Sequence, residues 1–389
     1  MAWMEVSVRD QRLEFVRLAS VEGANRRELC RRFGISAQTG YKWLGRMQQE
    51  AGLDDRSRRP LTSPSRASAD VESAVLAVRE MHPAWGARKI AVVLARQDIT
   101  VPAASTIHAI LARHGRITPP LGGADASLRF ERPEPNELWQ MDFKGWHRLG
   151  NGERLHPLTV IDDHSRYAVC IAACADQTGA TVRAQLEQVF RHHGLPQAFF
   201  VDNGKPWGDS RPVAWTSFRV WLLKLGIQLI YSRPYHPQGR GKNERFHRSM
   251  DDEVFAMRPL ADQKGAQKAF DHWRGVYNYQ RPHEGIGFKT PAERYRISPR
   301  AMPGKLPKVE YASTDIVRRI SKTKGHIVFK GRSWRVPDAF GGESLALRPF
   351  NIDGTYGVYF ASHLVLTIDL NISKSVNHVS EHVSAMSPG

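Results

Sequence analysis

The pattern of apolar residues predicts two helical units at the beginning of the chain. In the first fifty residues, apolar positions recur at helical spacing, as Leu29 and Phe33 do, and Gly34 and Ser36 separate two short helices. Two short helices joined by a tight turn are typical of a helix-turn-helix unit, although an ordinary helical hairpin has the same pattern. We predict that residues 1–53 form an N-terminal helix-turn-helix DNA-binding domain.

A second helical unit is predicted for residues 69–115. Three apolar-periodic segments, VESAVLAVREMH, WGARKIAVVLARQ and AASTIHAILARHG, are separated by turns that contain Pro or Gly. The charged, Pro- and Ser-rich segment 54–68 and the Pro- and Gly-rich segment 116–135 are typical of linkers. We therefore expect a second helix-turn-helix-like DNA-binding domain between two linkers.

From residue 136 the pattern changes to strands that alternate with helices. Apolar strands are predicted at LWQMDFKGW, LHPLTVID, YAVCIAACA, QAFFVDNG and IQLIYS. Helices are predicted at 178–194, 215–226, 240–257 and 263–280. Three adjacent strands followed by a β-α-β-α alternation predict a mixed five-stranded sheet with helices on both faces. We expect this central α/β core to span residues 136–295.

Short strands interrupted by Gly and Pro return near the end of the chain. HIVFKGRSWRVP, ESLALRPF and TYGVYFASHLVLTIDL predict a small all-β, barrel-like module at residues 311–371. A Pro-containing linker at 296–310 precedes it. The polar segment 372–389 is expected to be a disordered tail.

The chain carries a large excess of basic residues. Lys and Arg number 56 and Asp and Glu number 39, so the formal net charge is +17 at pH 7. Such an excess attracts polyanions, and nucleic acid is the usual one. The alternative is a generally basic protein without a nucleic-acid partner.

Cysteines and long apolar runs are scarce. Cys30, Cys170 and Cys174 are too few for a disulfide framework and lack a second pair at zinc-finger spacing, so we expect buried thiols. No apolar run is long enough to span a bilayer, and the first residues lack the pattern of a secretory signal. We expect a cytoplasmic protein without a membrane partner.

Three acidic residues occupy positions where a site is expected. Asp142 falls inside the apolar strand LWQMDF, and Asp202 ends the strand AFFVD. Ligands gather at the carboxyl ends of strands in open α/β sheets, and a charge there costs free energy unless it is paired or holds a metal. Glu244 follows the flexible GRGKN at the start of a helix. It points away from the apolar face that we predict to run from Phe246 to Met257.

Three carboxylates without Cys or His ligands suit a hard cation such as Mg²⁺ or Mn²⁺. Two such ions can bracket a phosphodiester, one at the attacking oxygen and one at the leaving oxygen. Asp202 and Glu244 also have simpler explanations, because an Asp before Asn-Gly commonly forms a turn and a Glu in the first turn of a helix is commonly a partner of the helix dipole. We interpret Asp162 and Asp163 as turn and salt-bridge residues.

Five motifs together resemble the integrase-core transposases of bacterial insertion sequences, a DDE family related to retroviral integrases. They are WQMDF, LTVIDDHSRY, VDNG, YHPQGRGKNERFHR and YNYQRPHEGIGFKTPAERY. The resemblance implies a ribonuclease H-like fold for residues 136–295. The expected architecture is therefore multidomain, with all-α helix-turn-helix units before this α/β core and the small all-β module after it.

The resemblance implies a DDE-type polynucleotidyl transferase whose catalytic and metal-binding residues are Asp142, Asp202 and Glu244. Mg²⁺ or Mn²⁺ is the implied cofactor, with two ions per active site. The three acids are spaced 60 (202 − 142) and 42 (244 − 202) residues apart. The second interval is longer than usual in this group, which we attribute to a loop insertion at KPWGDSRPVAW. The implied reaction is cleavage at the element's ends followed by transfer of the freed 3′-hydroxyl to target DNA.

The resemblance also implies double-stranded DNA, both element ends and target, as the partner. The helix-turn-helix units would read the terminal inverted repeats, and basic residues around Glu244 would hold phosphates. The candidate DNA-binding residues are Gln38, Thr39, Lys42, Arg46, Ser105, Thr106, Arg240, Lys242, Arg245 and Arg248. Pairing two DNA ends requires at least two active sites, so we expect a dimer or larger assembly on DNA, at the bacterial nucleoid.

Two other functions are compatible with these residues. A structure-specific nuclease of the same fold would cut DNA without joining ends. A helix-turn-helix transcription regulator with an inert core would bind DNA without metal-dependent cleavage.

Overall fold

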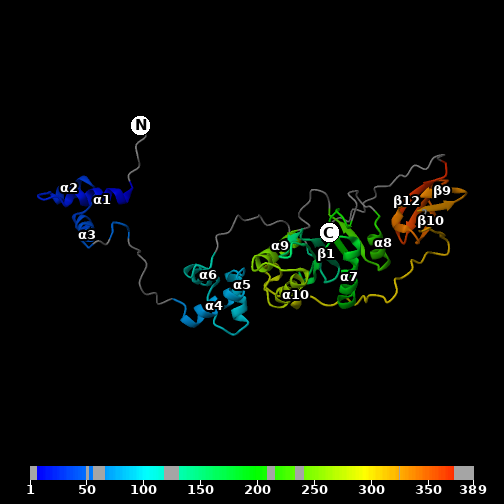
Figure 1. Cartoon of the computed structure of the whole chain (residues 1–389), viewed down its shortest axis with the longest axis horizontal. Helices are drawn as coiled ribbons and strands as arrows, with labels where there is room; N and C mark the ends of the chain where they lie inside the picture. Colours follow the sequence, from blue (N-terminus) through cyan, green and yellow to red (C-terminus); the bar gives the residue numbers. More distant parts are fainter. Residues whose placement is uncertain are drawn as a thin grey trace. The chain divides into compact units, whose positions relative to one another are not determined.

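Helices form the first part of the chain, as the sequence predicts (Figure 1). The computed structural model describes residues 7–49, 52–55, 66–117, 131–207, 215–232, 241–323 and 325–371. The chain divides between Arg66 and Ala67 into two units. The described residues of the first unit form the helices α1 (Val8–Ala19), α2 (Arg26–Arg32) and α3 (Ala37–Gln48).

The packing of these three helices matches the predicted helix-turn-helix unit. Ser36 is the N-cap of α3, since its side chain accepts a hydrogen bond from the Thr39 backbone N–H. Gly40 lets α3 approach the other helices closely, because a Cβ atom there would lie 2.6 Å from the Sγ atom of buried Cys30 and 2.8 Å from the Phe15 ring.

The second helical unit consists of α4 (Ala69–Met81), α5 (Ala87–Ala95) and α6 (Ala104–Arg113), as predicted. Its core is made of buried apolar residues such as Trp85 and Leu94, and Val276 of α10 (Gln263–Tyr279) packs against the same cluster. Arg96, at the end of α5, forms an ion pair with Glu293 at 3.0 Å. This helical unit is therefore held against the α/β core.

The α/β core contains a mixed sheet. Its strands are β1 (Leu138–Phe143), β2 (His147–Arg148), β3 (Arg154–Asp162), β4 (Ala168–Cys174), β5 (Ala198–Val201) and β6 (Gln228–Tyr231). The main order is β4-β3-β1-β5-β6, with β3 antiparallel to β1 and β4, and with β1, β5 and β6 parallel. The predicted mixed five-stranded sheet is confirmed, and the two-residue strand β2 extends it beside β3.

Helices cover both faces of this sheet, as predicted. On one face, α7 (Gly179–His193) and α8 (Ser217–Lys224) enclose a core that includes Trp139 and Phe199. On the other face, α9 (Gly241–Met250) and α10 enclose a core that includes Ile161 and Phe246. Figure 1 shows α9 and α10 on one side of β1 and α7 and α8 on the other.

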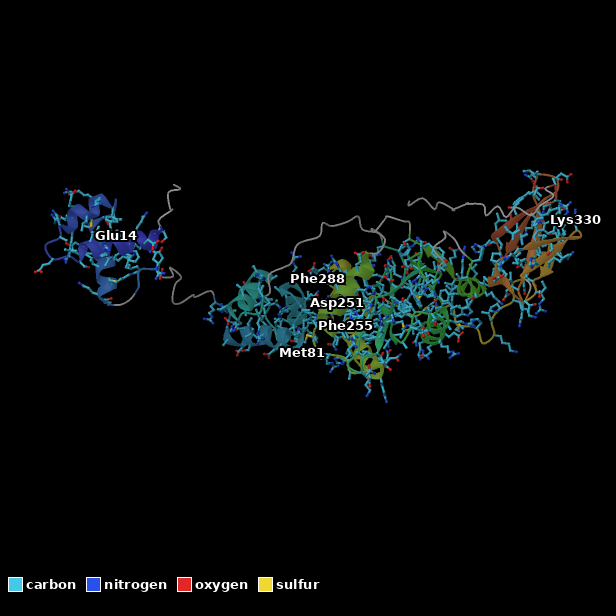
Figure 2. All side chains as sticks on the ribbon, turned by 45° about the horizontal axis from the view of Figure 1, so that its top comes forward. Glu14, Met81, Asp251, Phe255, Phe288 and Lys330 are labelled. Carbon is cyan, nitrogen blue, oxygen red and sulfur yellow. The ribbon has the colours of Figure 1, made fainter. Side chains whose placement is uncertain are left out.

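The helix that begins at Gly241 ends earlier than predicted. Residues Asp251–Phe255 form a π-helical turn, in which Figure 2 labels Asp251 and Phe255. Phe246, Met250 and Val254 are buried as predicted, but the prediction for Met257 is wrong because its side chain is 52% exposed. The wider π turn changes the helical period, so a residue eleven positions after Phe246 no longer faces the core.

A small all-β module follows the core, as predicted. Its strands are β7 (Ile316–Arg319), β8 (His326–Phe329), β9 (Arg332–Arg335), β10 (Ser344–Pro349), β11 (Thr355–Phe360) and β12 (His363–Asp369). They form a four-stranded sheet, β12-β11-β10-β7, and the hairpin β8-β9. The module packs on α8, since Val220 belongs to its core and Lys224 Nζ lies 2.7 Å from Glu343 Oε1.

The cysteines are free and buried, as predicted. Burial raises the pKa of Cys170 to about 12 and that of Cys174 to about 11, so both stay protonated at neutral pH. Within the described residues, no helix combines the length and apolar character needed to cross a bilayer.

Candidate active site

Asp142 lies near the carboxyl end of β1, on the sheet face that carries α9. Its neighbours Trp139 and Met141 are buried in the core beneath α7 and α8. Because strand side chains alternate between faces, Asp142 points to the opposite face. A contact across the sheet agrees, since Thr159 is paired with Asp142 in the antiparallel ladder and contacts His247 of α9. Directly opposed residues of such a ladder share a face.

Asp202 follows β5 directly and occupies the matching position beside Asp142. The parallel ladder pairs Gln140 with Phe200, and the same register continued by two residues sets Asp202 next to Asp142. Because residues paired in this way point to the same side, the two aspartates share one edge and one face of the sheet. Neighbouring strands lie about 4.8 Å apart. Asp202 also forms the predicted turn, because its Oδ1 accepts a hydrogen bond from the Gly204 N–H at 3.0 Å.

Glu244 lies on the exposed side of α9. Asn243, Phe246 and Met250 form part of the buried side of this helix, which contacts β1. Glu244 therefore keeps an exposed carboxylate on a helix that lies against the strand of Asp142.

The three carboxylates do not form a closed metal centre in this structure. Across the described residues, no group of three or more His, Cys, Asp or Glu side chains is close enough to hold an ion. Asp142 and Asp202 nevertheless fit a hard cation, because they share a sheet edge and offer only oxygen ligands. Glu244 would supply the third carboxylate from the neighbouring helix.

Lys242, which we expected at the DNA, is bound within the protein. Its Nζ atom lies 2.5 Å from Asp163 Oδ1 and 3.3 Å from the Asp163 carbonyl oxygen. Gln140 Nε2 donates to the same carboxylate at 2.7 Å, and Asp163 is fully buried. Burial lowers the pKa of Lys242 to about 8 although Asp163 raises it. The salt-bridge role predicted for Asp163 is therefore confirmed, with Lys242 as its partner.

Asp162 holds the turn that follows β3. Its Oδ1 accepts hydrogen bonds from the backbone N–H and the hydroxyl of Ser165, at 2.8 and 2.5 Å, and its Oδ2 accepts one from the Asn136 N–H at 2.7 Å. Burial raises the pKa of Asp162, and these hydrogen bonds oppose the rise. The predicted turn role of Asp162 is confirmed.

Two contacts that were not predicted from the sequence hold α9 and the turn after it beside the sheet. His247 Nε2 lies 2.8 Å from Thr159 Oγ1, and this hydroxyl donates to the Asp142 carbonyl oxygen at 3.0 Å. Lys144 Nζ pairs with Asp251 Oδ1 at 2.6 Å. The available signal was a threonine inside the apolar run PLTVID and a histidine one helical turn after the expected catalytic glutamate.

Trp207 fixes the first part of the loop that follows Asp202. Its side chain is 1% exposed, and its ring stacks on Phe143 with centroids 5.8 Å apart. The Tyr231 hydroxyl donates to the Trp207 carbonyl oxygen at 2.9 Å. The loop is therefore tied to the ends of β1 and β6, while residues 208–214 of the predicted insertion lie outside the described residues.

The candidate DNA-binding residues of the first helical unit lie on α3. Gln38 and Lys42 are exposed, whereas Thr39 takes part in the N-terminal cap. The charged ends of Lys42 and Arg46 lie over the Trp43 ring, 4.9 and 4.7 Å from its centroid. Gln38 is therefore the candidate whose side chain is most available to a base edge.

The remaining candidates lie on α6 and α9. Ser105 is exposed and Thr106 half-buried on α6, and Arg245 and Arg248 are exposed on α9. Arg240 lies outside the described residues.

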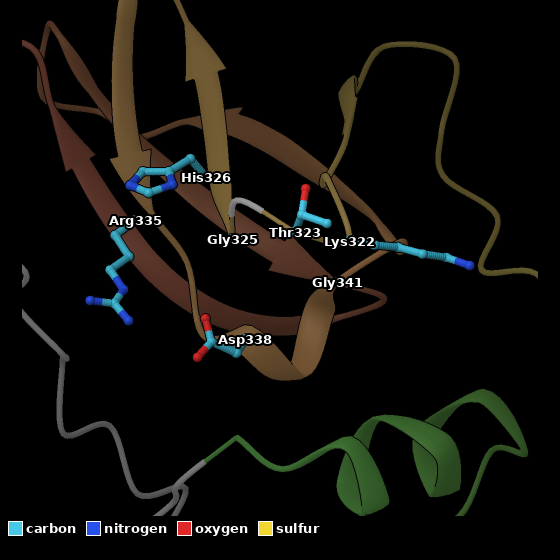
Figure 3. A pocket seen from close by; sticks show the side chains of 7 residues that line it. All are labelled: Lys322, Thr323, Gly325, His326, Arg335, Asp338 and Gly341. Carbon is cyan, nitrogen blue, oxygen red and sulfur yellow. The ribbon is translucent and has the colours of Figure 1, made fainter.

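A further pocket of about 350 Å³ lies in the β module (Figure 3). None of the acidic residues discussed above lines it. Its lining residues are Lys322, Thr323, Gly325, His326, Arg335, Asp338 and Gly341. The charged side chains among them are Lys322, Arg335 and Asp338, so the pocket offers a single carboxylate.

Models of known protein families match most of the chain. Two integrase core domain models match residues 132–237 and 225–291. A helix-turn-helix domain matches residues 11–60, and a homeodomain-like domain matches residues 39–111. The C-terminal domain of IS481 family transposases matches residues 315–376.

Two similar proteins are encoded by bacterial insertion elements. The chain is 33% identical over 159 residues to an uncharacterized 39.2 kDa protein of insertion element IS476 from Xanthomonas euvesicatoria, covering 41% of this chain and 44% of the relative. It is 31% identical over 159 residues to an uncharacterized 31.7 kDa protein of insertion element IS407 from Burkholderia multivorans, covering 41% and 55%. The chain thus spans about half the length of these curated relatives.

Among solved structures, the catalytic core domain of HTLV-2 integrase in complex with magnesium aligns with 42% of this chain and 97% of its own. The identity is 15% and the TM-score 0.32.

The fold and the matching family models thus agree on helix-turn-helix domains in the N-terminal part of the chain and an integrase core domain in its central part. The chain also resembles the transposases of bacterial insertion sequences, through the match to an IS481 family C-terminal domain and the similarity to two insertion-element proteins. The resemblance seen in its sequence motifs is thereby confirmed.

Proposed function

We propose that this protein is a transposase that binds the terminal inverted repeats of an insertion sequence and catalyses metal-dependent DNA cleavage and strand transfer. The observation that carries the proposal is the matching position of Asp142 and Asp202 on one edge and face of the sheet, beside the helix with Glu244. These three residues would form the catalytic triad and hold Mg²⁺ or Mn²⁺.

The metal, when bound, supplies charge neutralisation at the phosphodiester and activation of the attacking oxygen. The residues of the chain do the rest. Asp142 and Asp202 come from adjacent strands whose register is fixed by the core, so their separation is set before DNA arrives. Arg245 and Arg248, exposed on the helix of Glu244, would hold the phosphates that flank the cut.

Recognition and cutting are divided between parts of the chain. The helix-turn-helix domains would read base edges in the terminal repeats, and the phosphate contacts would supply affinity without sequence choice. Joining both ends of an element to one target needs two active sites, so the active form would be a dimer or larger assembly on DNA.

Two other functions use the same fold, a structure-specific nuclease and a transcription regulator with an inert core. An end-labelled oligonucleotide with the element's terminal repeat, incubated with the purified chain and Mn²⁺, separates the three. A joined strand-transfer product supports the transposase. Cutting without joining selects the nuclease, and binding without cutting selects the regulator.

A further inference from the structure

The helix that carries Glu244 is attached to the sheet at both edges of its buried face. Lys242 binds Asp163 on one side, and His247 contacts Thr159 on the other. At about 100° per residue, Lys242 and His247 lie about 140° apart around the helix axis. Two contacts so placed limit rotation of α9 about its axis, and with it the direction of Glu244.

The Thr159 hydroxyl connects α9 directly to the strand of Asp142. It lies 3.0 Å from the Asp142 carbonyl oxygen, to which it donates, and 2.8 Å from His247 Nε2. A hydroxyl has one proton, and a carbonyl oxygen can only accept. The Thr159 hydroxyl therefore donates its proton to the Asp142 carbonyl oxygen. His247 in turn donates its Nε2 proton to the hydroxyl oxygen of Thr159. This arrangement fixes the ring orientation of His247 and requires a proton on its Nε2 atom.

The position of this contact relates it to the proposed triad. Thr159 is fully buried and stands opposite Asp142 in the antiparallel ladder. His247 is three residues after Glu244, so the two side chains are neighbours on the helix surface, about 60° apart around the axis. A single chain of two hydrogen bonds thus runs from the backbone of one proposed metal ligand to the helical turn next to another.

We propose that His247 and Thr159 are positioning residues that set the orientation of the Glu244 helix relative to the Asp142 end of β1. This inference rests on the proposed function of the three acids. Neither residue touches the reacting atoms. Groups that orient metal ligands typically change metal affinity or activity by about 10- to 100-fold when they are removed, and we expect an effect of this size.

The test is a double-mutant cycle in the strand-transfer assay, with the full chain and Mn²⁺ or Mg²⁺. Thr159→Val and His247→Ala should each reduce the rate by about 10- to 100-fold, and the double variant should be little slower than either, because both break one connection. Thr159→Ser and His247→Gln keep the hydroxyl and an N–H at the same positions, so they should recover much of the rate. His272→Ala, at an exposed histidine of α10, is the matched control.

A second readout does not depend on activity. In the ¹⁵N-labelled protein without metal or DNA, the side-chain nitrogen spectrum should show His247 as the Nε2–H tautomer, and Thr159→Val should release this preference. Thermal unfolding and binding to repeat DNA show whether each variant is folded. A positioning role predicts that both stay close to wild type while the rate falls.

The outcomes separate this inference from the proposed function. If wild type joins strands and the single variants are as fast, or if their effects multiply independently, the positioning role is overturned. The Nδ1–H tautomer in wild type would overturn it as well. If wild type does not join strands at all, the proposed function fails and the catalytic role of this contact fails with it, while the tautomer still reports on the contact itself.

Discussion

Asp142, near the end of β1, and Asp202, directly after the parallel strand β5, occupy matching positions although 60 residues (202 − 142) separate them in the sequence. The pairing of Gln140 with Phe200 fixes this relationship two residues earlier in the ladder. Because a one-residue slip would turn each side chain to the other face, the buried partners of the strands determine the position of both carboxylates. The packing of the core therefore fixes where the two carboxylates of the candidate site lie.

Lys242 is expected to contribute to stability rather than to DNA binding. Lys242→Met would leave Asp163, which is fully buried, without its cation. Loss of one partner of a buried pair costs about 3–5 kcal/mol, and we expect a decrease of this order in the free energy of unfolding, measured with urea. The double variant Lys242→Met/Asp163→Asn should recover much of this loss. A stable Lys242→Met variant with a weaker salt dependence of DNA binding would instead make Lys242 a phosphate contact.

Acid should destabilise the protein through His283. Burial lowers the pKa of His283 well below the usual 6.5, and nearby Arg281 and Lys89 lower it further. The contribution of neutral His283 to the free energy of unfolding is fully present above pH 6.5. It is lost as the pH falls below that value, because the unfolded chain then takes up the proton more readily. His283→Leu should flatten this part of the stability curve.

The matched control for this pH prediction is His272→Leu, at an exposed position on α10. It should keep the wild-type dependence of unfolding free energy on pH between 5 and 7. If the unfolding free energy of wild type and of His283→Leu changed equally with pH over this interval, His283 would not be the group that causes the loss of stability in acid.

The β module and α8 are expected to unfold together. Phe340 of the module is fully buried, its ring packs on Trp215, and Val220 of α8 lies in the same core. Phe340→Ala should cost about 3–5 kcal/mol and should increase amide hydrogen exchange in α8 as well as in the module. Faster exchange confined to the module would mean that α8 does not depend on it.

Gln38 is the side chain of the first helical unit that we expect to read a base. It is exposed near the start of α3, whereas Lys42 and Arg46 lie over Trp43. Gln38→Ala should weaken binding to the preferred DNA sequence by about 1–3 kcal/mol and broaden the base preference at one position, in selection from a random library. A uniform loss over all sequences would indicate a phosphate contact instead.

The helices, strands and two aspartates could be predicted because they depend on local patterns. The apolar run AFFVD before Asn-Gly predicts both the buried strand and the position of Asp202 at its end. The alternation of side chains along LWQMDF likewise places Asp142 on the other face of the strand from Trp139 and Met141. Such features need no knowledge of distant partners.

The contacts of α9 could not be predicted, because they join residues that are distant in sequence. Lys242 carries the same charge whether it meets DNA or Asp163, 79 residues away, and only the fold decides between them. The exposure of Met257 could not be predicted either. A helical period inferred from the sequence assumes that the period continues, and the π-helical turn at Asp251–Phe255 interrupts it.

The most direct test of the account replaces each proposed ligand without changing its shape. Strand transfer of a pre-cut repeat end would be measured in Mn²⁺ for wild type, Asp142→Asn, Asp202→Asn and Glu244→Gln, with DNA binding measured in parallel. Asp252→Asn, at an exposed acid on the turn after the same helix, is the control. Loss of several kcal/mol of metal-dependent stabilisation predicts a decrease of about a hundredfold or more for each of the three, with end binding and the control unchanged. Joining at the wild-type rate by any of the three variants would contradict the proposed triad.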